Sequence, residues 1–572
     1  SWTDSSNDWT SEESAGFIRS KWKSRSRSGN RRFAVAGSHS EFRIAVCLPK
    51  GLRASIMLIC RQLVDAPDPE QAFDRVSGLP WCTWLDSSDP RPDTGRWTFL
   101  AVDPYEVLLA RDGDAWWVES EGIRHTGSGG LRYLERAIRQ AAESAAEAGD
   151  PGADFERVCT IPFSGGAAGF LSYEIGSEIE TLPRPRSRDP ALPDLEFGFF
   201  DVVVGWDHRE GTCHIVSTGL PERGADRRSR ASRRLEEVNA WIRGEALPPN
   251  PRGALAELAV SRSSLERLES AGQDPPGGPG GGSSVPDEAA EYPVAGAEGL
   301  HSNFTRAGYV AAVRDGICKI REGDVFQVNL SQRFISTAPV DPVTFYRELR
   351  QRSPAPFGAF FRGSSCTIAS SSPERFVQVD RDHRVESRPI KGTRRRSTDR
   401  VQDMELSAAL VSSDKDRAEN LMIADLLRND ISRISRAGTV RAAELFRLES
   451  FATVHHLVSI IEGRLRNGIG PVDVIRAMFP CGSVTGAPKI RAMEIIAELE
   501  SVARGPCYGS VGWIGLDGQM DLSVAIRTAV ITRERAAFHA GGAVVSDSHP
   551  EDEFAETLDK ARALAATLSY EI

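Results

Sequence analysis

Two short segments carry residues that could act together as a nucleophile and an acid. In Arg388-Pro-Ile-Lys-Gly-Thr393, Lys391 stands between Ile390 and Gly392, so we expect it in a turn with apolar surroundings. Loss of water lowers the pKa of a lysine, and the free amine is then a nucleophile. Upstream, Glu374 follows a proline at the end of an expected strand and could be a general acid or base. Taken alone, Lys391 could equally be a surface lysine beside a glycine turn.

A second group of residues has the charge and spacing of a magnesium site. Near the C-terminus, Glu553, Glu556 and Lys560 recur at intervals of three and four, which makes them neighbours on one helix face. Another helix, expected from about Asp414 to Ile434, carries Glu419. If carboxylates of the two helices face each other, they could hold Mg²⁺, which takes one or two protein carboxylates. An isolated Glu-x-x-Glu-x-x-x-Lys pattern would more often be a solvated, salt-bridged face.

The helices that carry these carboxylates have recognisable starts and faces. Ser548-His-Pro-Glu551 has the spacing of a capping box and predicts where the last helix begins. The helix near Asp414 is expected to turn one face inward, made of Ala418, Leu421, Met422, Asp425 and Leu426.

The segment Pro480-Cys-Gly-Ser-Val-Thr-Gly-Ala-Pro-Lys489 combines a flexible loop with the start of a helix. We expect Ile490, Met493 and Ile496 on the buried face of that helix. Unpaired backbone N–H groups at such a start bind anions, including phosphate and carboxylate. The G-x-x-x-x-G-K-[ST] order of a nucleotide-binding P-loop is absent. On its own the segment could also be an ordinary capped helix.

The composition argues against several classes of protein. The 572 residues carry a net charge of −10, whereas general nucleic-acid binding needs a cationic face. The nine cysteines are scattered and match neither a zinc knuckle nor a CxxC motif. The best apolar stretch, Ile44 to Cys60, contains Lys50 and Arg53 and is too short to cross a bilayer. With no signal-peptide pattern apparent, we expect a cytoplasmic protein without nucleic-acid or membrane partners.

Changes in composition along the chain predict its organisation. Residues 1–45 are polar and basic and are expected to be a disordered extension. A first domain is expected over residues 50–250. The segment 270–300 is rich in glycine and proline and predicts a linker or insertion. The denser region 301–572 is expected to be the catalytic domain.

In this order, the motifs resemble those of the chorismate-utilising enzymes. The resemblance is strong over about residues 303–570 and weaker over about 80–220. It rests on Phe326–Phe334, Ser372–Phe376, Pro389–Thr393, Ala418–Asp430, His456–Ser459, Gly482–Lys489, Ile526–Thr528 and Glu553–Lys560. The fold that it implies is α+β, with two large, mainly antiparallel sheets packed face to face as a sandwich and helices outside. Both halves of the chain are expected to contribute to the sheets.

Two positions distinguish members of the family. Isochorismate- and salicylate-forming members use water and carry a lysine at the position of Gln327, so this chain resembles a member that uses ammonia. Anthranilate-forming members usually read Pro-Ile-Ala-Gly-Thr where this chain has Lys391. The lysine is typical of members that convert chorismate to 4-amino-4-deoxychorismate, for p-aminobenzoate and folate. Anthranilate formation, and a non-catalytic relative that only binds chorismate-like acids, are the alternatives.

The resemblance also implies roles for individual residues. Lys391 would form a covalent adduct with the substrate, and Glu374 would protonate its leaving group. Glu419 and Glu556 would bind Mg²⁺, with Glu553 as a further or water-mediated ligand. The chain has no Gly-x-Cys-x-Gly-His run of a glutamine amidotransferase, so a separate amidotransferase subunit is expected to supply ammonia. The expected substrate-binding residues are Gln327, Gly392, Thr393, His456, Ser483, Gly486, Arg527, Gly541, Gly542 and Lys560.

Overall fold

The computed structural model describes residues 40–48, 52–91, 93–119, 121–147, 161–188, 191–248, 290–451 and 454–572. These residues belong to one compact unit, Ser40–Ile572. Of the expected extension 1–45, residues 1–39 lie outside the described residues. Residues 40–45 were wrongly included in it, because they are part of a strand that begins at Ser40. Of the linker expected over 270–300, residues 270–289 lie outside the described residues.

One large antiparallel sheet combines strands from both ends of the chain. Its strands are, in spatial order, β1 (Ser40–Leu48), β2 (Leu52–Gln62), β12 (Thr212–Ser217), β11 (Val202–Asp207), β4 (Trp97–Ala101), β3 (Thr83–Asp86), β16 (Phe357–Arg362), β17 (Thr367–Ser372), β26 (Thr528–Ile531), β27 (Ala536–Val544), β15 (Gln327–Ser336), β14 (Leu300–Ser302) and β13 (Tyr292–Pro293), with β8 (Ala146–Glu147) on β2 and β23 (Gly486–Ala487) on β15. The two sequence halves join where β3 pairs with β16, with Leu85 opposite Ala359.

The second antiparallel sheet is assembled in the same way. Its order is β20 (Ile390–Arg395), β22 (Val454–Arg464), β19 (Arg384–Ser387), β18 (Arg375–Val379), β25 (Met520–Val524), β24 (Ser510–Gly515), β9 (Gly166–Leu171), β10 (Leu195–Phe200), β5 (Glu106–Arg111), β6 (Asp114–Glu119) and β7 (Gly122–Ser128), with β21 (Arg441–Ser450) on β22. Here the halves join where β9 pairs with β24, with Gly169 opposite Gly512. These glycines also allow each strand to approach its other neighbour closely, since a Cβ on Gly512 would lie 2.1 Å from the backbone oxygen of Asp521 on β25 and one on Gly169 would lie 2.0 Å from that of Glu196 on β10.

The two sheets pack face to face over a shared apolar core. Phe99 and Phe361 of the first sheet belong to one buried cluster with Phe170 and Trp513 of the second. Alternating side chains of a strand point to opposite faces, so each sheet also has an outer face to cover. The expected α+β sandwich is therefore confirmed.

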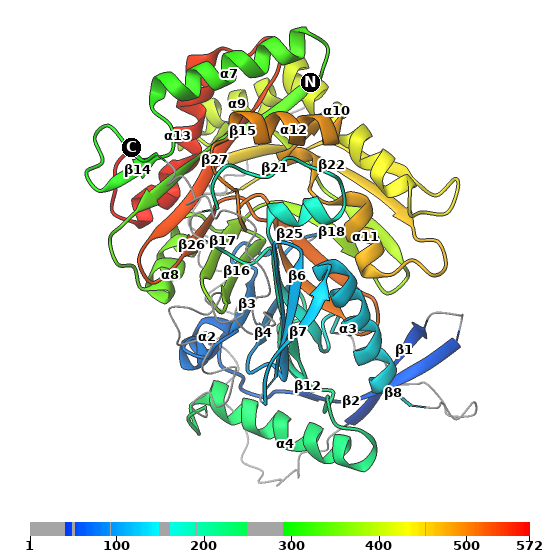
Figure 1. Ribbon diagram of the computed structural model, residues 1–572. Helices are drawn as coiled ribbons and strands as arrows, with labels where there is room; N and C mark the ends of the chain where they lie inside the picture. Colours follow the sequence, from blue (N-terminus) through cyan, green and yellow to red (C-terminus); the bar gives the residue numbers. More distant parts are fainter. Residues whose placement is uncertain are drawn as a thin grey trace, which may run out of the picture. The chain divides into compact units, whose positions relative to one another are not determined.

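Helices cover the outer faces of both sheets. In Figure 1, α7, α12 and α13 gather over β15 and β27, and their apolar side chains form one cluster with these strands. The helices are α2 (Pro69–Val76), α3 (Gly130–Ala145), α4 (Gly224–Arg243), α7 (Arg306–Arg321), α8 (Pro342–Arg352), α9 (Arg400–Ser412), α10 (Asp414–Ser432), α11 (Pro471–Met478), α12 (Lys489–Leu499) and α13 (Pro550–Thr567), with 3₁₀ turns η1 (Tyr173–Glu178) and η2 (Gly482–Val484). Across the described segments, no helix combines the length and apolarity that a bilayer crossing requires.

Three expectations about the helices were wrong. The inward face of α10 is made of Asn420, Ile423, Ala424, Leu427 and Ile431, whereas Leu421 and Asp425 are exposed. Ile490 of α12 is also exposed. In α13 the expected capping box is absent, because the N-cap residue is His549 and the Ser548 hydroxyl donates to Glu553 instead.

Candidate active site

Lys391 lies in a bulge of β20, where we had expected a turn. Ile390 pairs with Val458 and Thr393 pairs with His456, so Lys391 and Gly392 together oppose the single residue Leu457. A bulge re-aims a side chain and favours glycine where φ is positive. Gly392 has a φ of 87°, which a residue with a Cβ adopts at a cost. The Lys-Gly pair therefore determines the local backbone from which the lysine amine projects.

The amine of Lys391 reaches the loop between α11 and α12. Its Nζ donates to the carbonyl oxygen of Ser483 at 3.2 Å. The Ser483 hydroxyl in turn hydrogen-bonds to the carboxylate of Glu374. One residue of the predicted anion-binding loop thus contacts both predicted catalytic groups, which it brings into one site.

Burial changes the protonation of both catalytic candidates. Glu374 is 3% exposed, and burial raises the pKa of its carboxyl to about 7, although Ser483 and Lys391 oppose the rise. Burial lowers the pKa of Lys391, and Lys560 adds to this effect, while three nearby glutamates oppose it. A protonated carboxyl and an unprotonated amine therefore become easier to form at neutral pH than in water. This is the pairing that an acid and a nucleophile require.

His456 stands opposite Thr393 on β22 and is buried. Thr393 Oγ1 lies 2.8 Å from His456 Nδ1, within hydrogen-bonding distance. Burial, reinforced by the positive charge of Arg527, lowers the pKa of His456 to about 3. Its Nε2 is buried and has no hydrogen-bond partner. A neutral imidazole thus keeps one polar atom unused, which a bound substrate could engage.

Arg527 is a partly buried cation for which the described residues supply no acidic partner. Burial lowers the pKa of its guanidinium, and no carboxylate counteracts this effect. Its φ of 50° places it in the left-handed region between β25 and β26. Such a residue costs free energy in the absence of an anion. The planar guanidinium fits a carboxylate, so Arg527 is a candidate for binding one.

Gln327 is fully buried at the start of β15, and neither its Oε1 nor its Nε2 has a partner. The strand β23 lies directly against it, because Gly486 allows close contact. A Cβ on Gly486 would lie 2.1 Å from the carbonyl oxygen of Gln327. Gly486 therefore helps to bury an amide that can both donate and accept hydrogen bonds.

Three carboxylates gather between α10, α13 and β27. Burial raises the pKa of Glu419 and of Glu553, and the charge of Glu556 adds to both effects. Burial would also raise the pKa of Glu556, but the ammonium of Lys560, 2.6 Å away, outweighs it and lowers the pKa. Lys560 also donates to the carbonyl oxygen of Gly541 at 2.8 Å. Mutual repulsion of this kind favours a bound cation.

The chemistry of these donors fits Mg²⁺. All three groups are carboxylates, and Mg²⁺ prefers oxygen ligands. Glu553 Oε2 is buried without a partner and faces Gly542, where a Cβ would lie 2.7 Å from it. Among the described residues, no three His, Cys, Asp or Glu side chains already lie close enough together to hold a metal ion by themselves. Glu419, Glu553 and Glu556 are therefore the residues that could hold the ion together with substrate oxygens.

Two buried ion pairs that were not expected from the sequence support this site. Lys489 donates to Asp430 of α10 and to the carbonyl oxygen of Met478, both at 2.7 Å. Arg504 pairs with Glu500 at 2.6 Å and donates to the carbonyl oxygen of Val484. The i, i+4 spacing of Glu500 and Arg504 is a signal in the sequence, but it is typical of any helix surface.

Comparisons with known proteins agree with this architecture. Residues 82–566 match the family described as chorismate binding enzyme. The chain is 36% identical over 491 residues to aminodeoxychorismate synthase component 1 of Salmonella typhimurium, covering 86% of this chain and 94% of that protein. It is 38% identical over 404 residues to anthranilate synthase component 1 of Thermus thermophilus, covering 70% and 77%. The crystal structure of anthranilate synthase component I from Streptococcus pneumoniae superimposes with a TM-score of 0.62 at 28% identity, covering 82% of this chain and 92% of that one.

Fold and sequence together define a chorismate-utilising enzyme. The match spans most of the chain, including both sheets and the loop that carries Ser483. The chain therefore belongs to the family of chorismate-binding enzymes.

Proposed function

We propose that this protein converts chorismate and ammonia to 4-amino-4-deoxychorismate, for p-aminobenzoate and folate synthesis. The observation that carries the proposal is the bulge at Lys391, which presents an amine of lowered pKa beside the buried acid Glu374. Similarity to aminodeoxychorismate synthase component 1 over nearly the whole of that protein supports the same activity.

The first step replaces the C4 hydroxyl of chorismate. The unprotonated amine of Lys391 would bond to C2, the ring double bonds would shift, and the C4–O bond would break. Glu374 would give its proton to the departing oxygen, so that water leaves. The lysine nitrogen becomes a secondary amine by losing one proton, which would pass to the Glu374 carboxylate and regenerate the acid. Ser483 would hold both groups in position through its carbonyl and hydroxyl.

In the second step ammonia would bond to C4 and the double bonds would shift back. The bond between Lys391 and C2 would break, and the lysine would regain a proton from the attacking nitrogen. The new amine thus takes the place of the lost hydroxyl. An alanine at this position would offer no nucleophile, and ammonia would then attack C2 directly.

Other residues would bind the two carboxylates of chorismate. We assign the enolpyruvyl carboxylate to Arg527, Lys560 and the backbone at Gly541, because Arg527 lacks an acidic partner among the described residues. His456 and Thr393 would lie against the ring. Mg²⁺, bound by Glu419, Glu556 and Glu553, would supply positive charge for the ring carboxylate.

Ammonia would come from a separate amidotransferase subunit. The relatives named aminodeoxychorismate synthase component 1 carry a name that implies a second component. This chain lacks the cysteine motif of a glutaminase, which supports the same division of labour.

Anthranilate formation is the second candidate. Anthranilate synthase component 1 of Thermus thermophilus is as similar in sequence as the aminodeoxychorismate relatives, although over a shorter stretch. Lys391 argues against this candidate, since direct attack of ammonia at C2 needs no lysine.

Product analysis separates the two candidates. The chain would be incubated with chorismate, Mg²⁺ and an ammonium salt at alkaline pH, and the products identified by mass spectrometry and chromatography. We expect 4-amino-4-deoxychorismate, and little turnover when glutamine replaces ammonium. Anthranilate as the sole product would overturn the proposal, and strong glutamine-dependent turnover by the isolated chain would refute the separate subunit.

A further inference from the structure

Every residue assigned to the proposed reaction belongs to the second half of the chain, but one side chain of the first half reaches the same site. The segment between β3 and β4 brings Arg91 to Phe451, which follows β21. The guanidinium carbon of Arg91 lies 3.7 Å from the centre of the Phe451 ring, a close cation–π contact. A separate ion pair, between Asp93 and Arg447 of β21, joins the same two segments.

Arg91 is held in place within its own segment. Its Nη2 donates to the carboxylate of Asp89 at 2.7 Å, and its backbone N–H donates to the carbonyl oxygen of Thr94 at 2.8 Å. Gly95 lets the chain fold back here, because its φ is 69° and a Cβ on it would lie 3.2 Å from the backbone oxygen of Asp89. The side chain of Arg91 is only 19% exposed. The guanidinium therefore has a defined position against Phe451.

Phe451 lies between Arg91 and His456. Its ring is buried, and the ring centre is 5.2 Å from that of His456, with 69° between the two planes. Aromatic rings favour such an edge-to-face arrangement. The backbone of Phe451 is also fixed, since its N–H donates to the carbonyl oxygen of Val454 and its carbonyl oxygen accepts from Arg396. A shift of the Phe451 ring would therefore shift its neighbour His456.

His456 needs this second contact to keep one orientation. The torsion that turns an imidazole about its Cβ–Cγ bond has broad energy wells, so rotamer preference alone does not fix the ring. Thr393 restrains the ring at Nδ1 and leaves Nε2 without a partner. One hydrogen bond still allows the ring to tilt, whereas Phe451 packed against it limits the tilt. Together the two contacts define the direction of Nε2.

The charge of Arg91 supports the same state of the histidine. Burial and the charge of Arg527 lower the pKa of His456, and the charge of Arg91 adds to the effect. A neutral imidazole has one donor and one acceptor. The orientation of the ring then decides which of the two atoms meets the substrate.

We infer that Arg91 is a positioning residue for the reaction: through Phe451, it holds the imidazole of His456 in the orientation that meets the chorismate ring. The inference rests on the proposed place of His456 against that ring, but it does not depend on which product forms. It gives the first half of the chain a part in the active site beyond its strands in the two sheets.

Substitutions of Arg91 test the inference through the consumption of chorismate, with Mg²⁺ and an ammonium salt present. Arg91→Gln can still donate to Asp89 but leaves no cation over Phe451, whereas Arg91→Met removes both contacts. We expect kcat to fall roughly tenfold in each variant, with the KM for chorismate changed by less than about twofold, because the groups that bind its carboxylates are intact. Arg91→Lys returns a cation to the ring and should recover most of the loss.

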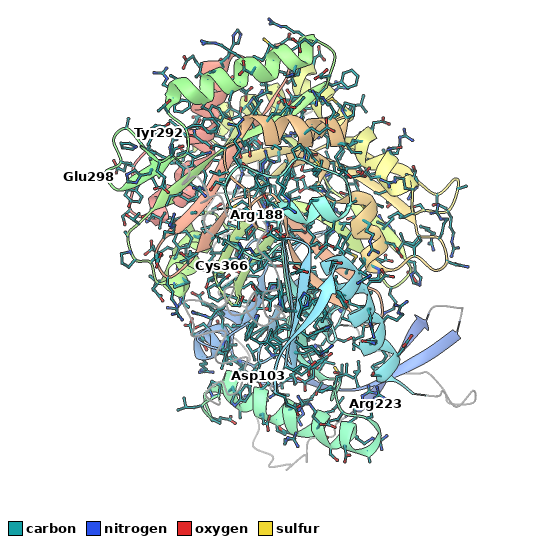
Figure 2. The ribbon with its side chains drawn as sticks, viewed as in Figure 1. Asp103, Arg188, Arg223, Tyr292, Glu298 and Cys366 are labelled. Atoms are coloured by element: carbon teal, nitrogen blue, oxygen red, sulfur yellow. The ribbon has the colours of Figure 1, made fainter. Side chains whose placement is uncertain are left out.

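A double-mutant cycle shows whether Arg91 acts through Phe451. Phe451→Leu should lower kcat by a similar factor, and Arg91→Gln added to it should lower kcat no further. Arg223→Gln is the matched control within the first half, and it should leave kcat and KM unchanged. Arg223 is exposed and donates to Ser144. Figure 2 shows it near α4 in the lower part of the view, whereas β22 lies in the upper part of the same view in Figure 1.

Three results would overturn the inference. The first is a wild-type kcat in both Arg91→Gln and Arg91→Met. The second is a raised KM at unchanged kcat, which would make Arg91 a substrate-binding cation instead. The third is an equal effect of Arg91→Gln with and without the Phe451 ring, which would mean that Arg91 acts by another path. Anthranilate as the product would overturn the proposed function and leave this inference standing, because the assay follows the loss of chorismate.

Discussion

Thr393 and His456 face each other across β20 and β22, with Thr393 Oγ1 2.8 Å from His456 Nδ1. This contact closes the bulge in which Lys391 and Gly392 oppose one residue. It therefore helps to determine the backbone position from which the Lys391 side chain extends to Ser483. The reactive geometry depends on strand pairing as much as on the identity of the lysine.

The covalent role of Lys391 predicts that Lys391→Ala loses 4-amino-4-deoxychorismate formation. We expect a fall of at least roughly 100-fold in kcat, because the nucleophile is gone. Chorismate and Mg²⁺ should still bind, since Arg527 and the carboxylates remain. Product formation measured by mass spectrometry and binding measured by calorimetry would check both parts.

Lys319→Ala is the matched control for this change, because Lys319 lies on α7, far along the chain from the bulge. It should leave turnover unchanged. Wild-type turnover in Lys391→Ala would remove the covalent step.

The burial of Glu374 should lower the free energy of unfolding at neutral pH, while the raised pKa suits its role as an acid. Burial raises its pKa from 4.5 to about 7. The folded state therefore disfavours the ionised carboxylate. This loss of stability is absent below pH 4.5 and grows as the pH rises. It is complete above pH 7, where it reaches on the order of 3 kcal/mol.

Glu374→Gln removes that charge while keeping the shape of the side chain. At pH 8 we expect the variant to have a higher Tm than the wild type, and a kcat lower by roughly 10²–10⁴-fold. At pH 4.5 the two Tm values should converge. Thermal unfolding at both pH values tests this, and a variant less stable than the wild type at pH 8 would contradict it.

Much of the site could be predicted from residue types, but its geometry could not. Glu374 and Lys391 were recognisable as an acid and a nucleophile from their neighbours in the sequence. The bulge was not, because it depends on the register of β20 against β22, whose residues lie more than 60 positions away. The same limit applies to Arg504, whose partners Val484 and Asn329 come from two other segments.

Local patterns also misled where a tertiary contact competed with them. Ser548 was expected to cap α13, but its hydroxyl instead meets the buried Glu553. The inward face of α10 is rotated from the predicted one because it must cover β22 and also present Glu419 to α13. The two-sheet topology came from the family resemblance and not from the strand pattern, which cannot determine which distant strands pair.

Mg²⁺ should stabilise the protein through Glu419, Glu553 and Glu556. A cation that binds only the folded state raises the Tm as its concentration rises. Glu556→Gln should weaken apparent Mg²⁺ binding roughly tenfold or more, as expected for the loss of about 1.4 kcal/mol or more. Thermal unfolding across a MgCl₂ titration measures this without reference to activity.

Glu551→Gln provides the control on the same helix. Glu551 is exposed and pairs with Arg306 at 2.9 Å. Its replacement should leave the Mg²⁺ titration unchanged. An unchanged titration for Glu556→Gln would instead rule out Glu556 as a ligand.

Arg527 should be required for chorismate binding, and it should lower the stability of the protein when no chorismate is bound. A hydrogen bond to a charged group contributes about 1.5–3 kcal/mol, so Arg527→Met should weaken chorismate binding by roughly 10- to 100-fold. In the absence of chorismate, the variant should have a higher Tm, because a partly buried cation without an acidic partner has been removed. Arg533→Met, at an exposed position, is the control. Chorismate affinity equal to that of the wild type would show that the anion binds elsewhere.

Gly392→Ala tests whether the bulge positions the lysine. Gly392 has a φ of 87°, and an added Cβ would lie 3.1 Å from both Asp416 and Leu410. Strain at a positive φ costs about 1–2 kcal/mol, and the crowding pushes β20 away from α10. Gly468 has a φ of 85° but open space around it, so Gly468→Ala carries the strain without the crowding. We expect both variants to lose Tm, Gly392→Ala more because of the crowding, but only Gly392→Ala to lose roughly tenfold or more in kcat at an unchanged KM for chorismate. Equal activity in the two variants would mean that the amine of Lys391 finds its position without the bulge.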